Sequence, residues 1–342
     1  MATTMQQLTF ISPGKVEWRE TKRPAIASAS DAIVRPIAST TCDVDQAIIR
    51  GQTPFNGPFA IGHECVAEII EVGDGVSGLE RGDVVCVPWH IACGTCKNCQ
   101  AGIPASCLAT PNAAMFGLPI GGDYGGLFDD YVRVPFAGEM LVKVPEGVNP
   151  HHVASFGDNV AVAWEVLKQH IDRVPGARVL VIGGSASIGL FVADVAVALG
   201  ADVHYVDRSS RRRELAKSIG ATVYKELPSP KMGDFDIGID ACVDPESLRK
   251  LLTMLKPEGY CESIGVYFED VPFPIFDMYM RGVNFHIGRV NSRVHLPFIL
   301  DLKQRGCIHP EHAYTATHSY DEIVEAISAS AKPLFVRDRI TI

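Results

Sequence analysis

The sequence predicts an α/β chain built from a β-rich, barrel-like part followed by a doubly wound parallel sheet with helices on both faces. One indication is the residue pattern of positions 1 to about 150, where short runs of β-branched residues alternate with turns that contain Gly-Asp or Pro. A second is the alternation of apolar strands and helices from about 174 to 288. The third is a glycine-rich turn between a strand and a helix in that second region.

The expected elements follow this division. In the first part, residues 83–87 (DVVCV) and 130–134 (DYVRV) have the composition of short strands. In the second part, strands at 178–182 and 202–206 enclose an apolar helix at 188–199, which ends before a glycine. The remainder predicts two helices, 296–305 and 320–331, and a final strand, 334–342.

Composition limits the possible partners and compartments. The formal net charge of -9 argues against nucleic acid or an anionic membrane surface as a partner. No apolar stretch is long enough to span a bilayer, so no membrane association is expected. The opening residues MATTM have neither a basic region nor an apolar core typical of a secretory signal, which predicts a cytoplasmic protein.

Four closely spaced cysteines are the strongest single motif. Cys93, Cys96, Cys99 and Cys107 have the spacing Cys-x2-Cys-x2-Cys-x7-Cys, and four thiolates this close can surround one zinc ion tetrahedrally. Disulfides are the alternative, but they require an oxidising compartment. Because four sulfurs complete the coordination shell, the motif predicts a structural zinc ion and places the chemistry elsewhere.

The glycine-rich turn follows the strand that ends at residue 182. Read from Gly184, the pattern is Gly-x-Ala-x-x-Gly, in which Ala186 replaces the glycine that usually approaches the pyrophosphate. Strand, turn, apolar helix and second strand together predict a Rossmann dinucleotide site. The turn residues expected to hold the dinucleotide are Gly184, Ala186, Ser187, Ile188 and Gly189.

A carboxylate at the end of the second strand predicts the choice of cofactor. Asp207 lies 23 residues beyond Gly184, near the spacing expected for the residue that binds the adenosine ribose. Its charge would repel a 2′-phosphate, which favours NAD over NADP. Arginines follow at Arg208 and 211–213; they either hold a 2′-phosphate or form a solvated helix start with Ser209 as its N-cap.

A second metal site is suggested by three separated residues. Cys42, His63 and Asp158 could bind zinc and leave a fourth position for water or substrate. Each residue alone is a weak signal, since a lone histidine is more often hydrogen-bonded within the structure than bound to a metal.

A family resemblance connects these motifs. Residues 62–64 (GHE) with Gly73 and Val76, the four-cysteine lobe, residues 125–132 and 144–147, and the glycine turn resemble, in order, the zinc-containing medium-chain alcohol dehydrogenases (the MDR superfamily). The resemblance implies a GroES-like catalytic domain (1–158), an inserted Rossmann domain (159–288) and a return to the catalytic domain (289–342). It also implies one catalytic and one structural Zn²⁺.

The resemblance also implies roles for single residues. Cys42, His63 and Asp158 take the catalytic zinc ligand positions, and the aspartate is similar to that of the bacterial secondary-alcohol branch. Glu64 is then a carboxylate able to swing toward the metal, and Asp45 orients the ligand histidine. The implied activity is hydride transfer between NAD(H) and an alcohol or carbonyl substrate, in a homodimer or homotetramer.

The chain departs from the family pattern beside the metal. The usual hydroxyl and histidine of the proton relay are replaced by Val44 and Ala47, and Ala67 stands where a glycine is common. Trp89 either lines the substrate pocket or belongs to the core. The aromatic residues that favour an apolar substrate are Trp89, Phe116, Tyr124 and Trp164.

Two other functions are compatible with parts of the pattern. A zinc-free quinone or enone reductase of the same superfamily would share the Rossmann turn, but such chains generally lack the cysteine lobe. A non-enzymatic NAD-binding protein would explain the missing relay, although it would have no use for the zinc ligands. The sequence therefore favours an NAD-dependent alcohol dehydrogenase or carbonyl reductase.

Overall fold

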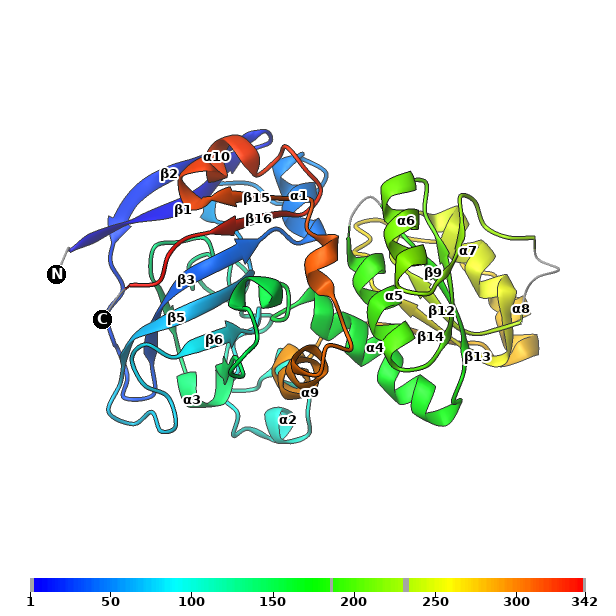
Figure 1. Ribbon diagram of the computed structural model, residues 1–342, viewed down its shortest axis with the longest axis horizontal. Helices are drawn as coiled ribbons and strands as arrows, with labels where there is room; N and C mark the ends of the chain where they lie inside the picture. The colour runs from blue at the N-terminus through cyan, green and yellow to red at the C-terminus, as the bar shows by residue number, and fades with distance from the viewer. Residues whose placement is uncertain (1–2, 185–186, 230–233, 341–342) are drawn as a thin grey trace. The chain divides into compact units, whose positions relative to one another are not determined.

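The computed structural model describes residues 3–184, 187–229 and 234–340. The chain forms two compact units (Figure 1). The first unit comprises Met1–Ala161, Val290–Gly306 and Tyr314–Ile342. The second comprises Val162–Arg289 and Cys307–Ala313.

The first unit is built on two β-sheets. The larger contains β3 (Ala32–Thr40), β5 (Glu64–Val72), β6 (Val84–Val87), β7 (Val132–Val134), β8 (Val142–Lys143), β15 (Ala316–Ser319) and β16 (Pro333–Val336). Its order is β15-β16-β3-β5-β6-β8, with β7 also paired to β3. The smaller sheet, in the order β2-β1-β4, contains β1 (Thr4–Ser12), β2 (Lys15–Lys22) and β4 (Phe59–Ala60).

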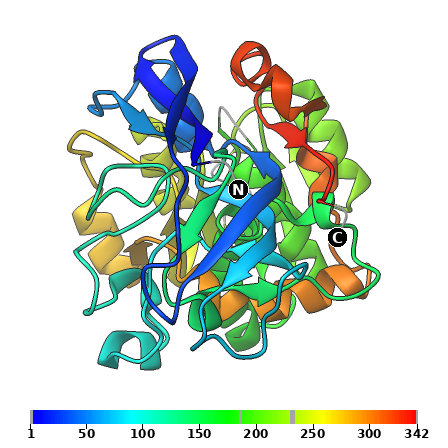
Figure 2. The same cartoon turned by 90° about the vertical axis from the view of Figure 1, so that its left-hand side faces the viewer.

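The centre of the larger sheet is almost completely buried. Strands β3 and β5 pair antiparallel and lie side by side in Figure 2. Pro36 lies inside β3, where it cannot donate a ladder hydrogen bond, and the pairing shifts between Pro36 and Ala38. Buried aliphatic residues of β3, β5 and β6, together with Phe116 and Leu127, form the core of this unit.

The second unit is a parallel sheet of six strands. These are β9 (Arg178–Ile182), β10 (Asp202–Val206), β11 (Thr222–Tyr224), β12 (Phe235–Asp240), β13 (Leu255–Ser263) and β14 (Asn284–Ile287). Their order, β11-β10-β9-β12-β13-β14, places the first strand of the unit in the middle, as in a doubly wound dinucleotide-binding sheet. The predicted fold class is therefore confirmed.

Helices cover both faces of this sheet. They are α4 (Asn159–Arg173), α5 (Ile188–Ala198), α6 (Ser210–Ser218), α7 (Pro245–Met254) and α8 (Ile275–Arg281). Figure 1 shows the strands between α5 and α6 on one side and α7 and α8 on the other. Helix α5 is buried along almost its whole length, which explains why its sequence is apolar on all sides.

The helices of the first unit are mostly short. They are α1 (Asp43–Ile49), α2 (Lys97–Gln100), α3 (Ala137–Met140), α9 (Ser292–Gln304) and α10 (Ile323–Ala326). Single 3₁₀ turns occur at η1 (Pro104–Ser106), η2 (Pro150–Val153) and η5 (Tyr320–Glu322), and a further turn, η4 (Pro310–Ala313), belongs to the second unit.

Two predictions for the C-terminal region were wrong in extent. The expected helix 320–331 is shorter and consists only of η5 and α10. The Gln46 side chain donates a hydrogen bond to the backbone carbonyl of Ile327 at 2.7 Å, and Ser328 and Ser330, which favour helix ends, follow it. The expected strand 334–342 ends at Val336 within the described residues, because the charged residues beyond it leave the sheet. There the amide of Ile340 donates to the Glu68 carboxylate at 2.9 Å.

The structure also bears on membrane association. Across residues 3–184, 187–229 and 234–340, no helix is long and apolar enough to cross a bilayer.

Candidate active site and metal centres

The first unit brings together three side chains that are far apart in the sequence. Cys42 precedes α1, His63 precedes β5, and Asp158 precedes α4. Their potential ligand atoms all lie within 4.8 Å of one another, and His63 Nε2 is 3.5 Å from Asp158 Oδ2. One thiol, one imidazole and one carboxylate at this spacing can hold a zinc ion and leave a fourth position open.

Two neighbouring residues fix the geometry of this triad. Asp45 Oδ1 lies 3.2 Å from His63 Nδ1, and Asp45 Oδ2 accepts a hydrogen bond from the Cys42 amide at 2.9 Å. The Asn159 amide group donates to Cys42 Sγ at 3.3 Å and to Asp158 Oδ2 at 2.7 Å. Asp45 and Asn159 therefore orient all three side chains, as supporting residues around a metal do.

A buried ion pair lies next to the triad. Glu64 and Lys332 are both fully buried, and the Lys332 ammonium donates to the Glu64 carboxylate. The other Glu64 oxygen accepts a hydrogen bond from the backbone N–H of Asn159 at 3.1 Å. Burial disfavours the charge on Lys332, but the Glu64 carboxylate outweighs this effect and raises the pKa of the lysine.

The electrostatics of the site fit a bound cation. Asp45, Glu64 and Asp158 contribute three carboxylates to the triad and its neighbours, against the single ammonium of Lys332. Negative charge therefore remains in excess even with the thiol neutral and the imidazole protonated. Burial raises the pKa of Cys42 to about 12, and the nearby Asp158 charge adds to this effect. A divalent cation would remove both problems, because it compensates the carboxylates and displaces the thiol proton.

The contact between Asp45 and His63 can be tested through metal affinity. We expect Asp45→Asn to weaken zinc binding at this site by about 10- to 100-fold. The uncharged asparagine amide would no longer hold the His63 ring in the orientation that allows it to bind the metal. Competition with a chromophoric zinc chelator measures the change. Asp43→Asn, on the same helix but half-exposed, is the control and should leave the affinity unchanged. Equal affinities in wild type and Asp45→Asn would contradict this role.

The four cysteines form a separate cluster around α2 and η1. The ligand sulfurs of Cys93, Cys96, Cys99 and Cys107 all lie within 4.8 Å of one another. Cys96 Sγ is 3.5 Å from Cys99 Sγ, far beyond the roughly 2.05 Å of a disulfide, and all four are free thiols. The disulfide alternative is therefore not realised among the described residues, and the arrangement suits a tetrahedral zinc ion.

Backbone amides prepare this cluster for a metal. The amide of Cys96 donates to Cys93 Sγ at 3.3 Å, and the amide of Leu108 donates to Cys96 Sγ at 3.3 Å. Hydrogen bonds from the backbone of Cys99 and Leu108 lower the pKa of Cys96 to about 6. Burial raises the pKa of Cys99 to about 12, so zinc binding would release at least that proton.

In the second unit the predicted dinucleotide turn joins β9 to α5. Ser187 is buried and precedes α5, which begins with Ile188 and Gly189 as expected, while Ala186 lies outside the described residues. A Cβ at Gly184 would lie 2.2 Å from the carbonyl oxygen of Ala241. Glycine at position 184 is therefore required by backbone packing as well as by any ligand.

Asp207 lies at the end of β10 and is almost completely buried. Arg212 binds it through two hydrogen bonds of 2.7 and 2.9 Å, and the Tyr205 hydroxyl donates to it at 2.7 Å. The Ser209 side chain accepts from the Arg212 amide, so the expected N-cap of α6 is present. This ion pair between Arg212 and Asp207 is not evident from the sequence, where Arg212 is one of four closely spaced arginines.

A cavity of about 630 Å³ opens beside the turn. Its lining includes Gly183, Gly184, Asp207, Arg208 and Arg212, together with Lys225 and Lys250. A volume of this order accommodates a small-molecule ligand, and both the predicted turn and the predicted carboxylate line it. The cavity therefore lies where the sequence predicts the adenosine part of a dinucleotide.

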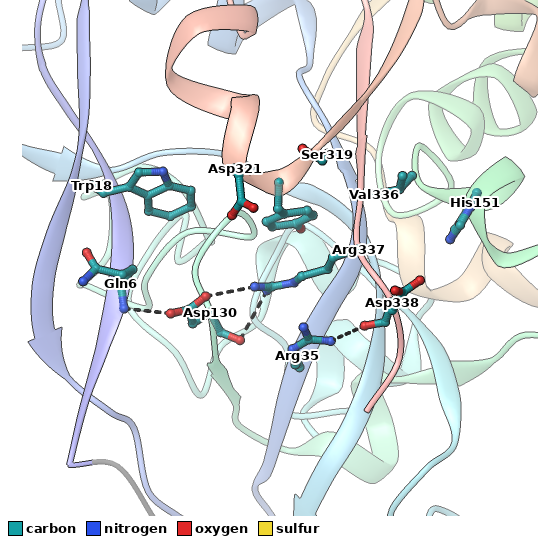
Figure 3. Close-up of a pocket in the computed structure, with 11 residues that line it drawn as sticks. Gln6, Trp18, Arg35, Asp130, His151, Ser319, Asp321, Val336, Arg337 and Asp338 are labelled. Carbon is teal, nitrogen blue, oxygen red and sulfur yellow. Dashed lines mark hydrogen bonds and ion pairs between the residues drawn. The ribbon is translucent and has the colours of Figure 1, made fainter. Parts of the chain in front are cut away.

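One cavity of the first unit lies away from the metal triad. It has a volume of about 650 Å³, and none of the three triad residues lines it. Figure 3 shows Arg337 beside Asp130, to which it donates a hydrogen bond at 2.9 Å. The Arg337 guanidinium also lies 4.0 Å from the centroid of the Tyr320 ring. Arg35 donates to the carbonyl of Asp338 at 2.6 Å. These contacts join β3, β16 and the segment before β7, which is a structural role.

The aromatic residues expected near a substrate have different positions. Phe116 is fully buried in the core of the first unit, and Tyr124 packs edge-on against it at 6.5 Å. Trp89 is also buried, and its indole N–H donates to the carbonyl of Val290 at 3.2 Å. Trp164 belongs to the second unit. Phe116 is therefore a packing residue.

Two functional candidates, Asn159 and Lys332, were missed from the sequence. Asn159 follows a predicted ligand directly, but an asparagine at the start of a helix is normally a cap. Lys332 comes just before a buried strand, and this was the available signal, because a lysine there must either be exposed or have a buried partner.

Comparisons with known proteins match both units. Residues 28–146 match the alcohol dehydrogenase GroES-like domain, and residues 187–295 match the zinc-binding dehydrogenase domain. L-threonine 3-dehydrogenase of Streptomyces coelicolor is 30% identical over 265 residues, which cover 73% of each chain.

Solved structures have the same fold. Alcohol dehydrogenase TADH from Thermus sp. ATN1 superimposes with a TM-score of 0.87 at 28% identity, covering 97% of this chain and 99% of that one. Two structures at 25% identity cover 98% of this chain and 100% of their own. One, a short chain alcohol dehydrogenase from E. coli CFT073 (TM-score 0.83), contains NADH. The other, a zinc-binding dehydrogenase from Sinorhizobium meliloti 1021 (TM-score 0.82), contains NADP.

These matches agree with the predicted family in the order of the domains. The GroES-like domain comes first and the zinc-binding dehydrogenase domain second, as the sequence motifs indicate. The chain therefore belongs to the zinc-containing medium-chain alcohol dehydrogenase family of NAD(P)-dependent oxidoreductases, which act on small-molecule alcohols.

Proposed function

We propose that the protein is a zinc-dependent oxidoreductase that transfers a hydride between NAD(H) and an apolar alcohol or carbonyl substrate. The observation that carries this proposal is the buried cluster of Cys42, His63 and Asp158, whose ligand atoms lie within 4.8 Å of one another. In this assignment residues 1–158 and 289–342 form the catalytic domain, and residues 159–288 bind the dinucleotide.

The proposed mechanism assigns separate tasks to the residues around the triad. A zinc ion held by Cys42, His63 and Asp158 would supply Lewis acidity to the substrate oxygen. Asp45 holds the His63 ring through its Nδ1 at 3.2 Å, so that Nε2 faces Asp158. Lys332 holds Glu64 by an ion pair, which keeps this carboxylate from competing for the substrate position.

The proton path is the least usual part of the proposal. Val44 and Ala47 on α1 replace the polar side chains of the family relay, and neither can donate or accept a proton. We assign proton loss from the alcohol to water. Because hydroxide becomes more available as the pH rises, alcohol oxidation should accelerate toward alkaline pH.

For the cofactor we propose NAD(H). Asp207 supports this choice, since a carboxylate in the cavity beside the turn disfavours a 2′-phosphate. The bidentate contact with Arg212 offsets part of that charge, and Arg208 and Lys225 line the same cavity. The expected preference for NADH is therefore a matter of degree, and it depends on the Asp207 charge.

The cofactor assignment predicts the behaviour of Asp207→Asn. The amide keeps the shape of the side chain but loses its charge, so the ratio of kcat/KM with NADPH to that with NADH should rise by about tenfold or more. Asp202→Asn, at the exposed start of the same strand, is the control and should leave the ratio unchanged. A wild type that prefers NADPH would contradict the assignment.

The second unit also supports a homo-oligomer, proposed here as a homodimer or homotetramer. Helix α8 exposes Ile275, Phe276, Tyr279 and Met280 by 64 to 80%, and β14 is an edge strand of the sheet. Large exposed apolar side chains gathered on one helix are typical of an interface, and we propose a second copy of this chain as the partner. Phe276→Glu with Tyr279→Glu should lower the mass measured by sedimentation, whereas a monomeric wild type would contradict the proposal.

The proposed activity is tested with NADH and a panel of simple ketones and aldehydes. We expect the absorbance of NADH to fall with at least one apolar carbonyl compound, and a strong zinc chelator to abolish this reaction. Readdition of zinc should restore it. Activity that survives complete zinc removal would support a zinc-free reductase instead, and NADH binding without turnover of any alcohol or carbonyl compound would support a non-enzymatic protein.

A further inference from the structure

A third group of metal-binding side chains lies on the segment Cys307–Ala313, which belongs to the second unit although the chain on both sides of it belongs to the first. His309, Glu311 and His312 each offer one ligand atom, and these atoms lie within 4.8 Å of one another. His309 Nδ1 is 3.6 Å from Glu311 Oε1. The two imidazole rings are nearly parallel, at 15°, with centroids 5.4 Å apart.

The position of this cluster is fixed by α5. The backbone N–H of His309 donates to Asp194 Oδ2 at 2.7 Å, and Asp194 is largely buried. His309 and His312 line one small cavity with Asp194 and with apolar residues of α5 and α6. The cluster therefore faces the Asp194 carboxylate, whose negative charge favours a cation close to it.

The donor set indicates which ions would bind. Two imidazoles and one carboxylate suit zinc, nickel and copper, whereas magnesium and calcium prefer an all-oxygen shell. Ligand atoms around a tetrahedral zinc lie roughly 3.3 to 3.5 Å apart, given bond lengths near 2.0 to 2.1 Å. The observed 3.6 Å between His309 and Glu311 is already close to that separation.

We propose that His309, Glu311 and His312 form a third, exchangeable site for a divalent transition-metal ion, distinct from the triad and from the cysteine cluster. Both histidines are exposed and Glu311 is half-buried, so the ion would keep one or more positions open to solvent. Three ligands from four consecutive residues, without a thiolate, bind more weakly than the four-cysteine cluster. The bound ion would restrict the motion of Cys307–Ala313. It would add to the hydrogen bond by which Asp194 of α5 already holds the backbone of His309.

The test uses the full-length protein with its tightly bound zinc in place. After desalting, zinc or nickel is added and free and bound metal are measured by equilibrium dialysis. We expect one additional ion per chain, and its affinity should fall at least about tenfold in His312→Ala and in Glu311→Gln. His286→Ala is the matched control, since it removes an exposed histidine that also faces a carboxylate, Glu262 at 2.7 Å.

Clear outcomes would overturn the proposal. One is that no additional ion binds at any metal concentration below that at which the metal or the protein precipitates. Another is that His312→Ala and Glu311→Gln both bind the additional ion with unchanged affinity. The third is that His286→Ala no longer binds the additional ion. Because His312 is exposed, its replacement should leave the circular dichroism spectrum and the melting temperature of the protein unchanged when no metal is bound at this site. These readouts do not depend on catalytic activity, so failure here is distinguishable from failure of the proposed function.

Discussion

Replacing His63 with alanine is expected to abolish turnover while leaving dinucleotide binding intact. The imidazole is one of only three candidate ligands in the triad, and its loss removes both a ligand and the contact with Asp45. Lewis-acid stabilisation by a metal contributes several kcal/mol, so kcat/KM should fall by about 1,000-fold or more. Steady-state kinetics and NADH fluorescence titration measure the two effects separately.

The cysteine cluster provides the matched control for this experiment. Cys99→Ser removes one sulfur from a four-sulfur shell in a different part of the same unit. It should lower zinc content and thermal stability, while protein that remains folded keeps most of its activity. A His63→Ala variant with near wild-type turnover, or a Cys99→Ser variant that is fully folded but inactive, would contradict the separation of catalytic and structural sites.

Replacing Lys332 with methionine is expected to produce the largest loss of stability. Lys332 and Glu64 are both fully buried, so the substitution leaves the carboxylate without its charged partner in a low-dielectric environment. Breaking a buried pair in this way typically costs about 3 to 5 kcal/mol. Scanning calorimetry should show a lower melting temperature for the unit that contains β5 and β16.

Two comparisons isolate the ion pair from the loss of lysine itself. The double variant Glu64→Gln with Lys332→Met removes both charges and should recover part of the lost stability. Lys250→Met breaks an exposed pair with Glu246, 2.7 Å apart on one helix, and should cost no more than about 0.5 kcal/mol. Equal effects of Lys332→Met and Lys250→Met would show that burial is not what makes the Lys332 pair important.

The parts of the account that the sequence could supply are local ones. The four cysteines lie within 15 residues, so their spacing alone predicts a cluster. The strand, turn and helix around Gly184 are equally local, and the structure has β9 and β10 at the expected residues. Cys42, His63 and Asp158 are separated by up to 116 residues, so only the family resemblance brought them together before the structure did.

What the sequence could not supply depends on the paths of distant segments. Lys332 reaches Glu64 across 268 residues. Its position before a buried strand points to a buried partner, but nothing local identifies Glu64 as that partner. The short length of α10 also depends on a distant segment. The side chain of Gln46, 281 residues away, donates a hydrogen bond to the Ile327 carbonyl, which a longer helix would use for its own backbone. Tertiary hydrogen bonds therefore decided both the unexpected partner and the incorrect helix length.

The dependence of activity on zinc content tests the central claim most directly. Zinc is removed stepwise with a chelator, the ions remaining per chain are measured, and NADH oxidation is followed with a carbonyl substrate identified in the panel. We predict two tightly bound zinc ions per chain, at the triad and at the cysteine cluster, and a loss of activity in proportion to loss of the triad ion. Full activity in protein that contains no zinc, or only the zinc of the cysteine cluster, would contradict the account.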